Sequence, residues 1–401
     1  MPIRTTPFPE RPPRFGQEEL QALQQALAKN KLWYWQQGSV VESVMKITAT
    51  RFGANYAVAT SSGTASLHVA IAAARMPPGT EVVTTPITDI GTINAILYQN
   101  LIPVFAEVDP DLAMPRPEHI AAAITKNTGA VVAVHLTGCP MYIDEVATVC
   151  AEKGVMLIED CAQGLGATYK GRSIGQFGHF GCFSLNDQKH ITSGEGGFVL
   201  TDTEDRFYLC HNYADKYYDR HRKGVRLHAL APNYRMSELD GAMATAQLPK
   251  LDAIITKRRR LGDRLSAELA KIKGIIPQTR PTGAEASYFF YLFRIDTSVI
   301  TCDRDQFIQQ LGAEGIPATG AYVPMPIYKS PYFANKSFFP GGTWPAELVS
   351  GRTYDYNTVH LPGVELAVST GVSLPLHEGF EDSDIDDYIA AISAVAARNT
   401  S

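Results

Sequence analysis

The chain between Tyr56 and Asp202 alternates short apolar runs with helix-like segments. Seven runs stand out, and they read YAVAT, EVVTT, PVFAEV, AVVAVH, VMLIED, GCFSL and GFVLT. Several are apolar at nearly every position, as expected of strands that are covered on both faces. Segments such as TASLHVAIAAARM separate the earlier runs. The alternation predicts an α/β fold, with a mostly parallel sheet of seven strands between layers of helices.

The pattern changes after residue 235. Residues 236–272 predict one long helical stretch that is broken near Pro249. Farther on, YFFYLFRID is expected to be a strand, and DRDQFIQQLGAEG and DSDIDDYIAAISAVAAR are expected to be helices; the aromatic and proline-rich residues 322–345 predict an irregular loop. A chain of 401 residues exceeds one typical hydrophobic core. We therefore expect a large domain over residues 1–255 and a smaller C-terminal α+β domain over residues 256–401.

Charge and cysteine content exclude several kinds of partner. The net charge of −5 gives no positive field for nucleic acid or an anionic membrane. No apolar run approaches the roughly 20 residues of a membrane-spanning helix, and the N-terminal segment has no apolar core like that of a signal peptide. The six cysteines are scattered without CxxC pairing. This favours reduced thiols in a cytoplasmic protein over a metal site or a disulfide framework.

A first candidate motif follows the YAVAT run. Ser61, Ser62, Gly63 and Thr64 lead from this strand into a helix. A helix N-terminus has free N–H groups and a positive dipole end, which suit a phosphate, and Gly63 allows close approach of an anion. Taken alone, the motif is also typical of helix caps that bind nothing.

A second motif, VMLIEDCAQ, places Asp160 at the end of a buried strand. Ligands of open α/β sheets bind at this edge, and a buried carboxylate needs a cation or hydrogen-bond donors. A protonated pyridine nitrogen is a suitable partner, and Gln163 can donate to a phenolate oxygen. The alternative is that Asp160 caps a helix and that Gln163 lies on the surface.

The third motif is FSLNDQKHITSGEGG, in which Lys189 lies in a loop rich in small residues. A lysine reacts with an aldehyde as the neutral amine, so its pKa must fall through burial or a nearby cation. Ser184, on the preceding strand, can bind the same phosphate as the SSGT turn. Together the three motifs supply a phosphate cradle, a carboxylate for a ring nitrogen and an amine for an aldehyde. These are the contacts that pyridoxal 5′-phosphate requires.

These motifs identify a family resemblance. The chain resembles the DegT-type sugar aminotransferases, which are pyridoxal phosphate enzymes of fold type I, the aspartate aminotransferase fold. The resemblance runs nearly end to end and includes YAVATSSGTASLHVAI, VVAVHLTGCPMYIDEV, IEDCAQGLGATYKGRSIGQFGHFGCFSL, KHITSGEGGFVLTD, NYRMSELDGAMATAQL and VSLPLHEGF. It implies a homodimer that handles a small-molecule amino donor and a carbonyl acceptor.

The resemblance also implies roles for individual residues. Lys189 is expected to form the Schiff base and to move the proton, Asp160 to hold the protonated ring nitrogen, and Gln163 to contact the ring's 3-oxygen. The expected phosphate ligands are Gly63, Thr64 and Ser184, together with Asn233, which is expected to reach the neighbouring subunit's phosphate.

Four residues remain candidates for the substrate site, each with an alternative. His135 ends the AVVAVH strand near the expected ring position, or it is a buried histidine with satisfied hydrogen bonds. Arg235 is a partner for the donor's carboxylate, or it holds the dimer interface. Tyr322 and Tyr328 line the entrance, or they are packing residues.

The sequence departs from the family pattern in three places. The loop after the second strand reads TTPITDIGTINAI and lacks the aromatic residue that stacks on the cofactor ring, so Ile87, Asp89 or Ile90 must lie there. The segment before NYRM lacks the usual His-Gly-Arg pattern. His190 follows Lys189, whereas a dehydratase branch of the family has His in place of the lysine.

We therefore predict an aminotransferase that moves an amino group from glutamate, glutamine or another amine to a keto sugar, a cyclitol ketone or another carbonyl acceptor. Two alternatives are kept; the presence of Lys189 favours transamination over the first, and the absence of a helix-turn-helix or basic segment from the sequence gives no support for DNA binding by the second. One is a pyridoxal phosphate-dependent sugar dehydratase, and the other is a regulator that binds the cofactor without turnover.

Overall fold

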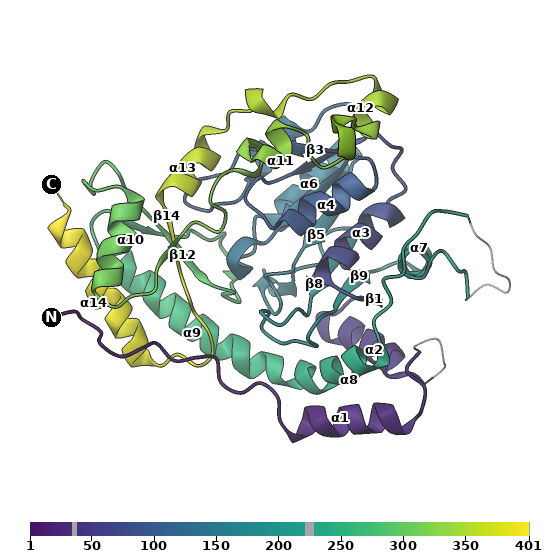
Figure 1. Ribbon diagram of the computed structural model, residues 1–401, viewed down its shortest axis with the longest axis horizontal. Helices are drawn as coiled ribbons and strands as arrows, with labels where there is room; N and C mark the ends of the chain where they lie inside the picture. Colours follow the sequence, from purple (N-terminus) through teal and green to yellow (C-terminus); the bar gives the residue numbers. More distant parts are fainter. Residues whose placement is uncertain (34–37, 221–227, 401) are drawn as a thin grey trace.

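The computed structural model describes residues 1–33, 38–220 and 228–400. Its centre is a seven-stranded sheet in the order β1-β9-β8-β5-β4-β2-β3 (Figure 1). Only β9 runs antiparallel to its neighbours, so the predicted mostly parallel sheet is confirmed. The strands are β1 Tyr56–Thr60, β2 Glu81–Thr84, β3 Ile102–Phe105, β4 Thr128–Val134, β5 Met156–Asp160, β8 Phe180–Ser184 and β9 Gly197–Thr201.

Helices cover both faces of this sheet, and alternate strand residues face opposite layers. Val58 and Val132 pack on one face beneath α3 Gly63–Ala73, α4 Ile90–Tyr98 and α7 Glu204–Ala214. Ala57 and Val131 pack on the other face, beneath α2 Val40–Phe52, α5 Pro117–Ala123, α6 Ile143–Lys153 and α8 Glu238–Gln247. Burial on both sides explains why the strands are apolar at nearly every position.

The long helical stretch is confirmed, and it breaks where the sequence predicts. α8 passes into a short 3-10 turn, η2 Leu248–Lys250, and continues as α9 Leu251–Leu269. Pro249 lies in that turn because proline fits the first turn of a helix but not its interior. The predicted domain boundary at residue 255 falls within α9 and stays a prediction.

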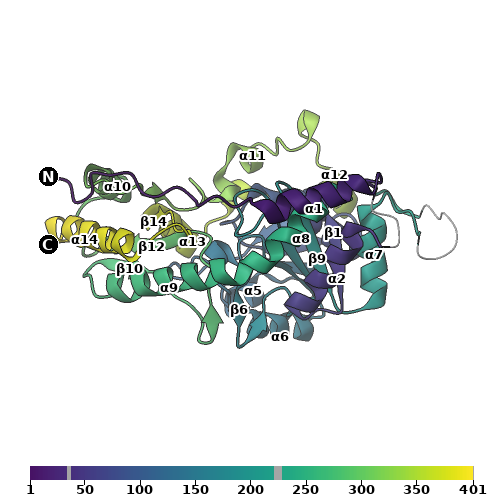
Figure 2. The same ribbon diagram turned by 90° about the horizontal axis from the view of Figure 1, so that it is seen from below.

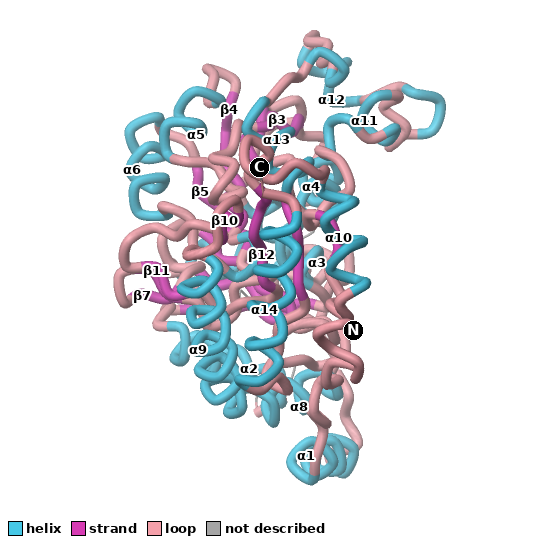
Figure 3. The backbone as a smooth tube through the Cα atoms, turned by 90° about the vertical axis from the view of Figure 1, so that its left-hand side faces the viewer, coloured by secondary structure: helices cyan, strands magenta, loops and turns pink. Residues whose placement is uncertain are grey.

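The C-terminal part forms a second, antiparallel sheet in the order β10-β12-β14-β13. Its strands are β10 Ile275–Pro277, β12 Tyr291–Ile295, β13 Thr319–Gly320 and β14 Gly371–Leu374. The two predicted helices are present as α10 Arg304–Ala313 and α14 Asp382–Arg398. Figure 3 shows two strands of this sheet, β10 and β12, near helix α14. Strand β12 begins at Tyr291 and not at Tyr288, because the backbone N–H groups of Ser287 and Phe289 donate to Gly138 and Thr137 beside the large sheet.

The aromatic segment 322–345 is less irregular than expected, because it contains short helical turns. They are η3 Ile327–Lys329, α11 Pro331–Ala334 and η4 Pro340–Gly342, followed by α12 Pro345–Ser350, η5 Tyr356–Thr358 and α13 Pro362–Thr370. A small third sheet and one more turn complete the molecule: β6 Thr168–Tyr169, β7 Arg172–Ser173, β11 Ala284–Glu285 and η1 Leu136–Gly138.

An N-terminal arm, residues 1–16, crosses the molecule before helix α1 Gln17–Ala28 (Figure 2). Near its start Arg4 binds Asp384 and Asp387 at 2.8 Å, and α1 then lies against α8. The arm therefore links the C-terminal part to the helices beneath the large sheet. Within the described ranges, no helix has the length and apolar character needed to cross a membrane.

Candidate active site

A cavity of about 320 Å³ lies where the carboxyl ends of β5 and β8 meet the start of α3. This is the edge of an open α/β sheet at which ligands bind. The cavity brings together most of the residues that the sequence selects. Those that line it are Gly63, Thr64, Asp160, Gln163, Ser184, Lys189 and Tyr322.

The start of α3 forms one end of the cavity. Ser62 is the N-cap, and its hydroxyl accepts the N–H of Ala65 at 3.0 Å. The preceding amides, at Gly63 and Thr64, have no acceptor inside the helix. A Cβ at Gly63 would lie 2.7 Å from the Cβ of Ser184, so glycine is needed for β8 to approach the helix this closely. Free amides, a helix dipole and the Ser184 hydroxyl suit a phosphate.

Asp160 lies deeper, at the end of β5, and is 5% exposed. One carboxylate oxygen accepts the Thr92 hydroxyl at 2.7 Å, and the other accepts the N–H of Ala162 at 3.1 Å. Burial raises the pKa of this carboxyl above its ordinary value, against the hydrogen bonds from Thr92 and Ala162 and the charge of Lys189. Among the described residues, no cation forms an ion pair with Asp160, so the site suits a ligand that carries a proton on a ring nitrogen.

The side-chain amide of Gln163 is oriented by the backbone. Its Oε1 accepts the N–H of Thr137 at 2.7 Å, and Thr137 has a positive φ of 65°. With its oxygen occupied in this way, the amide presents its NH₂ group as a donor at the cavity wall. The predicted contact with a phenolate oxygen is consistent with this orientation.

Lys189 lies in the loop between β8 and β9, and its Nζ is 4.3 Å from the centroid of the Phe289 ring. Burial lowers the pKa of the Lys189 amine; Asp160 and Asp89 oppose this shift, and Arg11 adds to it. No ion pair of Lys189 occurs in the part of the chain that the structure describes. A partly desolvated, unpaired amine is the form that attacks an aldehyde.

In the loop after β2, the three candidates Ile87, Asp89 and Ile90 take different positions relative to the cavity. Ile87 is in the core, Ile90 is not part of the cavity wall, and Asp89 lines the cavity. Asp89 also caps α4, because its carboxylate accepts the N–H of Gly91 at 2.7 Å. A carboxylate therefore lies in the loop where the family places an aromatic ring.

Among the wall residues that sequence reasoning missed, Thr92 and Phe289 contact the predicted Asp160 and Lys189. Thr92 lies on α4, one turn after the polar residues of the β2 loop, and its hydroxyl binds Asp160. Phe289 was expected inside a strand, but its backbone N–H instead donates to the carbonyl of Thr137. Neither residue lies close to the three motifs in the sequence, so no local pattern marks either of them as part of the site.

Two predicted residues lie outside the cavity wall. His135 is buried, with its Nε2 3.1 Å from Glu159 and its Nδ1 accepting the N–H of Met141 at 3.3 Å. Tyr328 is buried in the core, and its hydroxyl is 3.3 Å from Glu365. These contacts agree with the structural alternative for both residues. Tyr322 lines the cavity and stacks on Phe290, with centroids 5.5 Å apart.

Asn233 and Arg235 also lie outside the cavity of this single chain. Their segment is attached to the SSGT turn, because the backbone N–H of Ser61 donates to the backbone carbonyl of Tyr234 at 2.8 Å. Arg235 binds the buried carboxylate of Asp215, and Asn233 is exposed. The divergent segment before NYRM lies partly outside the described residues, at 221–227.

The cavity fits pyridoxal 5′-phosphate on the chemistry of its own groups. It offers amides at a helix start, a buried carboxylate without a cation, an amide donor and a desolvated amine. These match the phosphate, the ring nitrogen, the phenolic oxygen and the aldehyde of that cofactor.

Comparisons with known proteins identify the family. A family model described as the DegT/DnrJ/EryC1/StrS aminotransferase family matches residues 13–393. The chain is 29% identical over 411 residues to a Micromonospora echinospora protein provisionally named an L-glutamine:3-amino-2,3-dideoxy-scyllo-inosose aminotransferase, covering 98% of this chain and 95% of that protein. It is 28% identical over 389 residues to the spore coat polysaccharide biosynthesis protein SpsC of Bacillus subtilis, covering 95% of each.

A solved structure agrees with this result. The aminotransferase from Psychrobacter cryohalolentis has a TM-score of 0.84 and 28% identity, covering 98% of this chain and all of that one (100%). A family match over most of the chain, together with the fold and the cavity, leads to one conclusion. The chain belongs to the DegT/DnrJ/EryC1/StrS aminotransferase family, and it is an aminotransferase that uses pyridoxal 5′-phosphate.

Proposed function

We propose that Lys189 is the catalytic lysine, that its Nζ holds the cofactor covalently, and that it moves the proton during amino transfer. The observation that carries this proposal is the lowered pKa of a cavity amine with no ion pair among the described residues. Bound pyridoxal phosphate supplies an aldehyde carbon and an electron-withdrawing ring. The chain's own residues supply position, charge and a proton carrier.

The other cavity residues divide the remaining work. Asp160 would keep the ring nitrogen protonated. A buried carboxylate without an ion pair is stabilised by a nearby positive charge, and the protonated nitrogen would supply that charge. The amides of Gly63 and Thr64, with the hydroxyl of Ser184, bind the phosphate. The NH₂ group of Gln163 donates to the ring oxygen. Thr92, through its hydrogen bond to Asp160, positions that carboxylate.

For the substrates, we propose glutamate or glutamine as the amino donor and a keto sugar or cyclitol ketone as the acceptor. Support comes from the relatives, one of which is provisionally named a glutamine-dependent inosose aminotransferase, while another is named for polysaccharide biosynthesis. Asp89 in the wall adds a hydrogen-bond acceptor for the hydroxyl groups of such a ring.

We further propose a homodimer in which Asn233 completes the neighbouring subunit's phosphate site. The exposure of Asn233 and its attachment beside the SSGT turn support this arrangement. A cytoplasmic location is likewise a proposal, supported by cysteines that are all unpaired and, apart from Cys302, buried.

The experiment that tests the proposed function is a half-reaction with glutamate or glutamine. The cofactor-loaded protein should change its absorbance on addition of the donor, and a keto acceptor should restore the original spectrum. Lys189→Ala should abolish both changes, whereas Lys153→Ala, at an exposed lysine, should leave them intact. Borohydride reduction followed by peptide mapping should label Lys189.

Two outcomes would favour the alternatives. A Lys189→His variant that keeps turnover would favour a dehydratase, and a spectrum that no amino donor changes would favour a non-catalytic regulator. Modification by borohydride at another lysine would refute the role of Lys189.

A further inference from the structure

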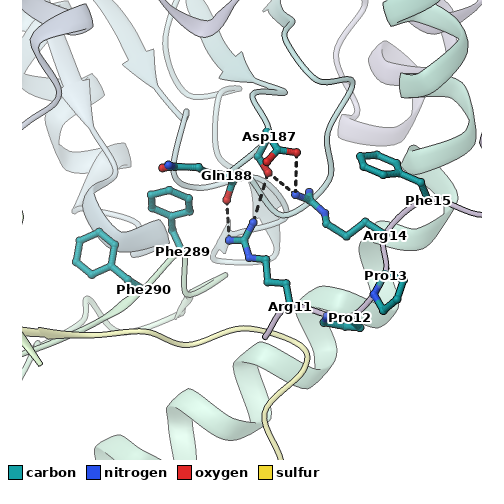
Figure 4. Close-up of a pocket in the computed structure, with 9 residues that line it drawn as sticks. All are labelled: Arg11, Pro12, Pro13, Arg14, Phe15, Asp187, Gln188, Phe289 and Phe290. Atoms are coloured by element: carbon teal, nitrogen blue, oxygen red, sulfur yellow. Dashed lines mark hydrogen bonds and ion pairs between the residues drawn. The ribbon is translucent and has the colours of Figure 1, made fainter. Parts of the chain in front are cut away.

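A second cavity, of about 630 Å³, lies between the N-terminal arm and the loop that carries Lys189. Figure 4 shows Arg11 and Arg14 reaching from the arm toward the backbone of residues 187 and 188, with the rings of Phe289 and Phe290 on the opposite side. The guanidinium groups on one wall can bind an anionic group, and the aromatic rings on the other wall can stack on a ring to which that group is attached.

This cavity adjoins the one that contains Lys189. Gln188 and Phe289 line both cavities, so they form the shared wall. Phe289 also contacts the Lys189 amine, as described above. A substrate held beside Lys189 can therefore extend past Phe289 toward the arm.

Around the arm cavity, the three arginines Arg11, Arg14 and Arg258 outnumber the two carboxylates, Asp187 and Glu378, that form ion pairs with them among the described residues. Buried Arg258 is paired with Glu378 at 2.6 Å, and Arg14 lies 3.9 Å from Asp187, whose side chain is 72% exposed and thus well screened. Arg11 forms no ion pair among the described residues, although its charge helps to lower the pKa of nearby Glu378; it donates hydrogen bonds to the carbonyls of Gln188 at 2.7 Å and Asp187 at 3.5 Å. The guanidinium therefore keeps unused donors.

The reaction cavity itself is short of cations. Among the residues that line it in the described chain, Lys189 is the one cationic side chain, and it must be neutral to react. Arg235, the cation that the sequence suggests for a substrate carboxylate, is bound to Asp215. Within the described chain, the reaction cavity thus offers no cation for an anionic group on a substrate, whereas Arg11 offers one in the adjoining cavity.

We propose that the arm cavity is a subsite for an anionic group, a carboxylate or a phosphate, on a substrate whose reacting carbon lies beside Lys189. Arg11 binds the anion directly, and Arg14 adds to the positive potential. This inference rests on the proposed function, because it extends the same active site. The source of the anion is either the α-carboxylate of the amino donor or a phosphate or carboxylate on the carbonyl acceptor.

A structural explanation competes with this subsite. Arg14 donates to the carbonyl of Lys189 at 2.6 Å, and Arg11 donates to the neighbouring carbonyls, so both arginines hold the reactive loop. If these hydrogen bonds only hold the loop in place, their loss would slow the reaction of every substrate. Loss of an anion subsite would weaken only anionic ligands, which separates the two explanations.

The direct test uses inorganic pyrophosphate as the probe and the cofactor-loaded protein, whose own phosphate site is filled. Calorimetric titration at low ionic strength should detect binding to the wild-type protein. Arg11→Gln should weaken that binding by about 10- to 100-fold, the effect of losing a charge-assisted fork. Arg11→Lys should retain part of it. Arg260→Gln, at an exposed arginine paired with Asp382, is the matched control and should bind as the wild type does.

Kinetics then identify the source of the anion. If the donor's carboxylate uses the subsite, Arg11→Gln should raise the half-saturating concentration of glutamine. If the acceptor's anion uses it, the variant should raise KM for a keto-sugar phosphate and leave the unphosphorylated keto sugar unchanged. Either result supports the subsite.

Three results would overturn it: no pyrophosphate binding to the wild type, equal binding by Arg11→Gln, or a uniform fall in kcat for all substrates with unchanged KM. The titration needs no turnover, so it is independent of the proposed function. A wild-type protein that binds pyrophosphate but responds to no amino donor would refute the proposed function alone.

Discussion

Glu159 and Asp160 are adjacent carboxylates on strand β5, and the structure treats them in opposite ways. Glu159 is fully buried and accepts the N–H groups of Gly175, Phe177 and Gly178, each at 2.7 Å, as well as facing His135. Asp160 faces the other side of the sheet, where it accepts two hydrogen bonds and lines a cavity.

The difference teaches how to separate a structural carboxylate from a functional one. A buried charge is tolerated when its acceptor sites are filled, and Glu159 reaches that state within the chain itself. Asp160 does not, so its negative charge remains available to an external cation. His135, the partner of Glu159, lies with it on the far side of the strand and does not line the cavity.

The largest expected effect comes from removing the functional carboxylate. Asp160→Ala should slow the donor half-reaction by about 10³-fold, because a preorganised charge at the ring nitrogen is lost. The apo protein should melt no lower than the wild type, since an isolated buried charge disappears. Stopped-flow absorbance and thermal melting check the two parts, and a melting temperature that falls with the activity would contradict the assignment.

The structural carboxylate should show the reverse behaviour. Glu159→Gln should reduce stability by about 2–4 kcal/mol, because its NH₂ group then faces backbone donors in a buried site. The half-reaction rate of the folded protein should stay close to the wild-type value. Denaturant unfolding of the apo protein measures the loss.

The matched control is Glu285→Gln, whose wild-type carboxylate forms an exposed ion pair with Arg259 at 3.0 Å. Its effect should stay within about 0.5 kcal/mol. If Glu159→Gln were as mild as this control, the contrast between the two β5 carboxylates would be wrong.

The smallest effect concerns pH. Because burial raises the pKa of Asp160, the folded apo protein binds this proton more tightly than the unfolded chain does. Its stability should therefore fall as pH rises from about 4, the ordinary Asp pKa, through the raised folded pKa. Asp160→Asn lacks this loss, so its melting temperature should exceed the wild-type value by a margin that grows over this window and then levels off. A margin independent of pH would argue against an unpaired carboxylate.

The sheet and the central motifs were predictable because their signals are local. A run such as VMLIED is apolar enough to need cover on both faces, and the polar residue that ends it must lie at the sheet edge. Pro249 likewise marks the helix break without outside information. The catalytic role of Lys189 was inferred in the same way and stays a prediction that borohydride mapping can test.

Other features depended on contacts between distant residues. Phe289 leaves its expected strand because residues 287 and 289 bond to residues 137 and 138, more than a hundred positions away. Thr92 reaches Asp160 across 68 positions, and Arg14 reaches Lys189 across 175. No local pattern encodes such pairs.

By itself, the sequence determined the α/β layering, the order of the motifs and the family, because periodicity and residue type act over a few neighbouring positions. Only the tertiary structure decided that Asp89, and not Ile87 or Ile90, faces the cavity, and that an arginine-bearing arm lies beside Lys189. Which of several nearby side chains turns inward depends on how separate segments pack, and that packing is settled by the free energy of the whole fold.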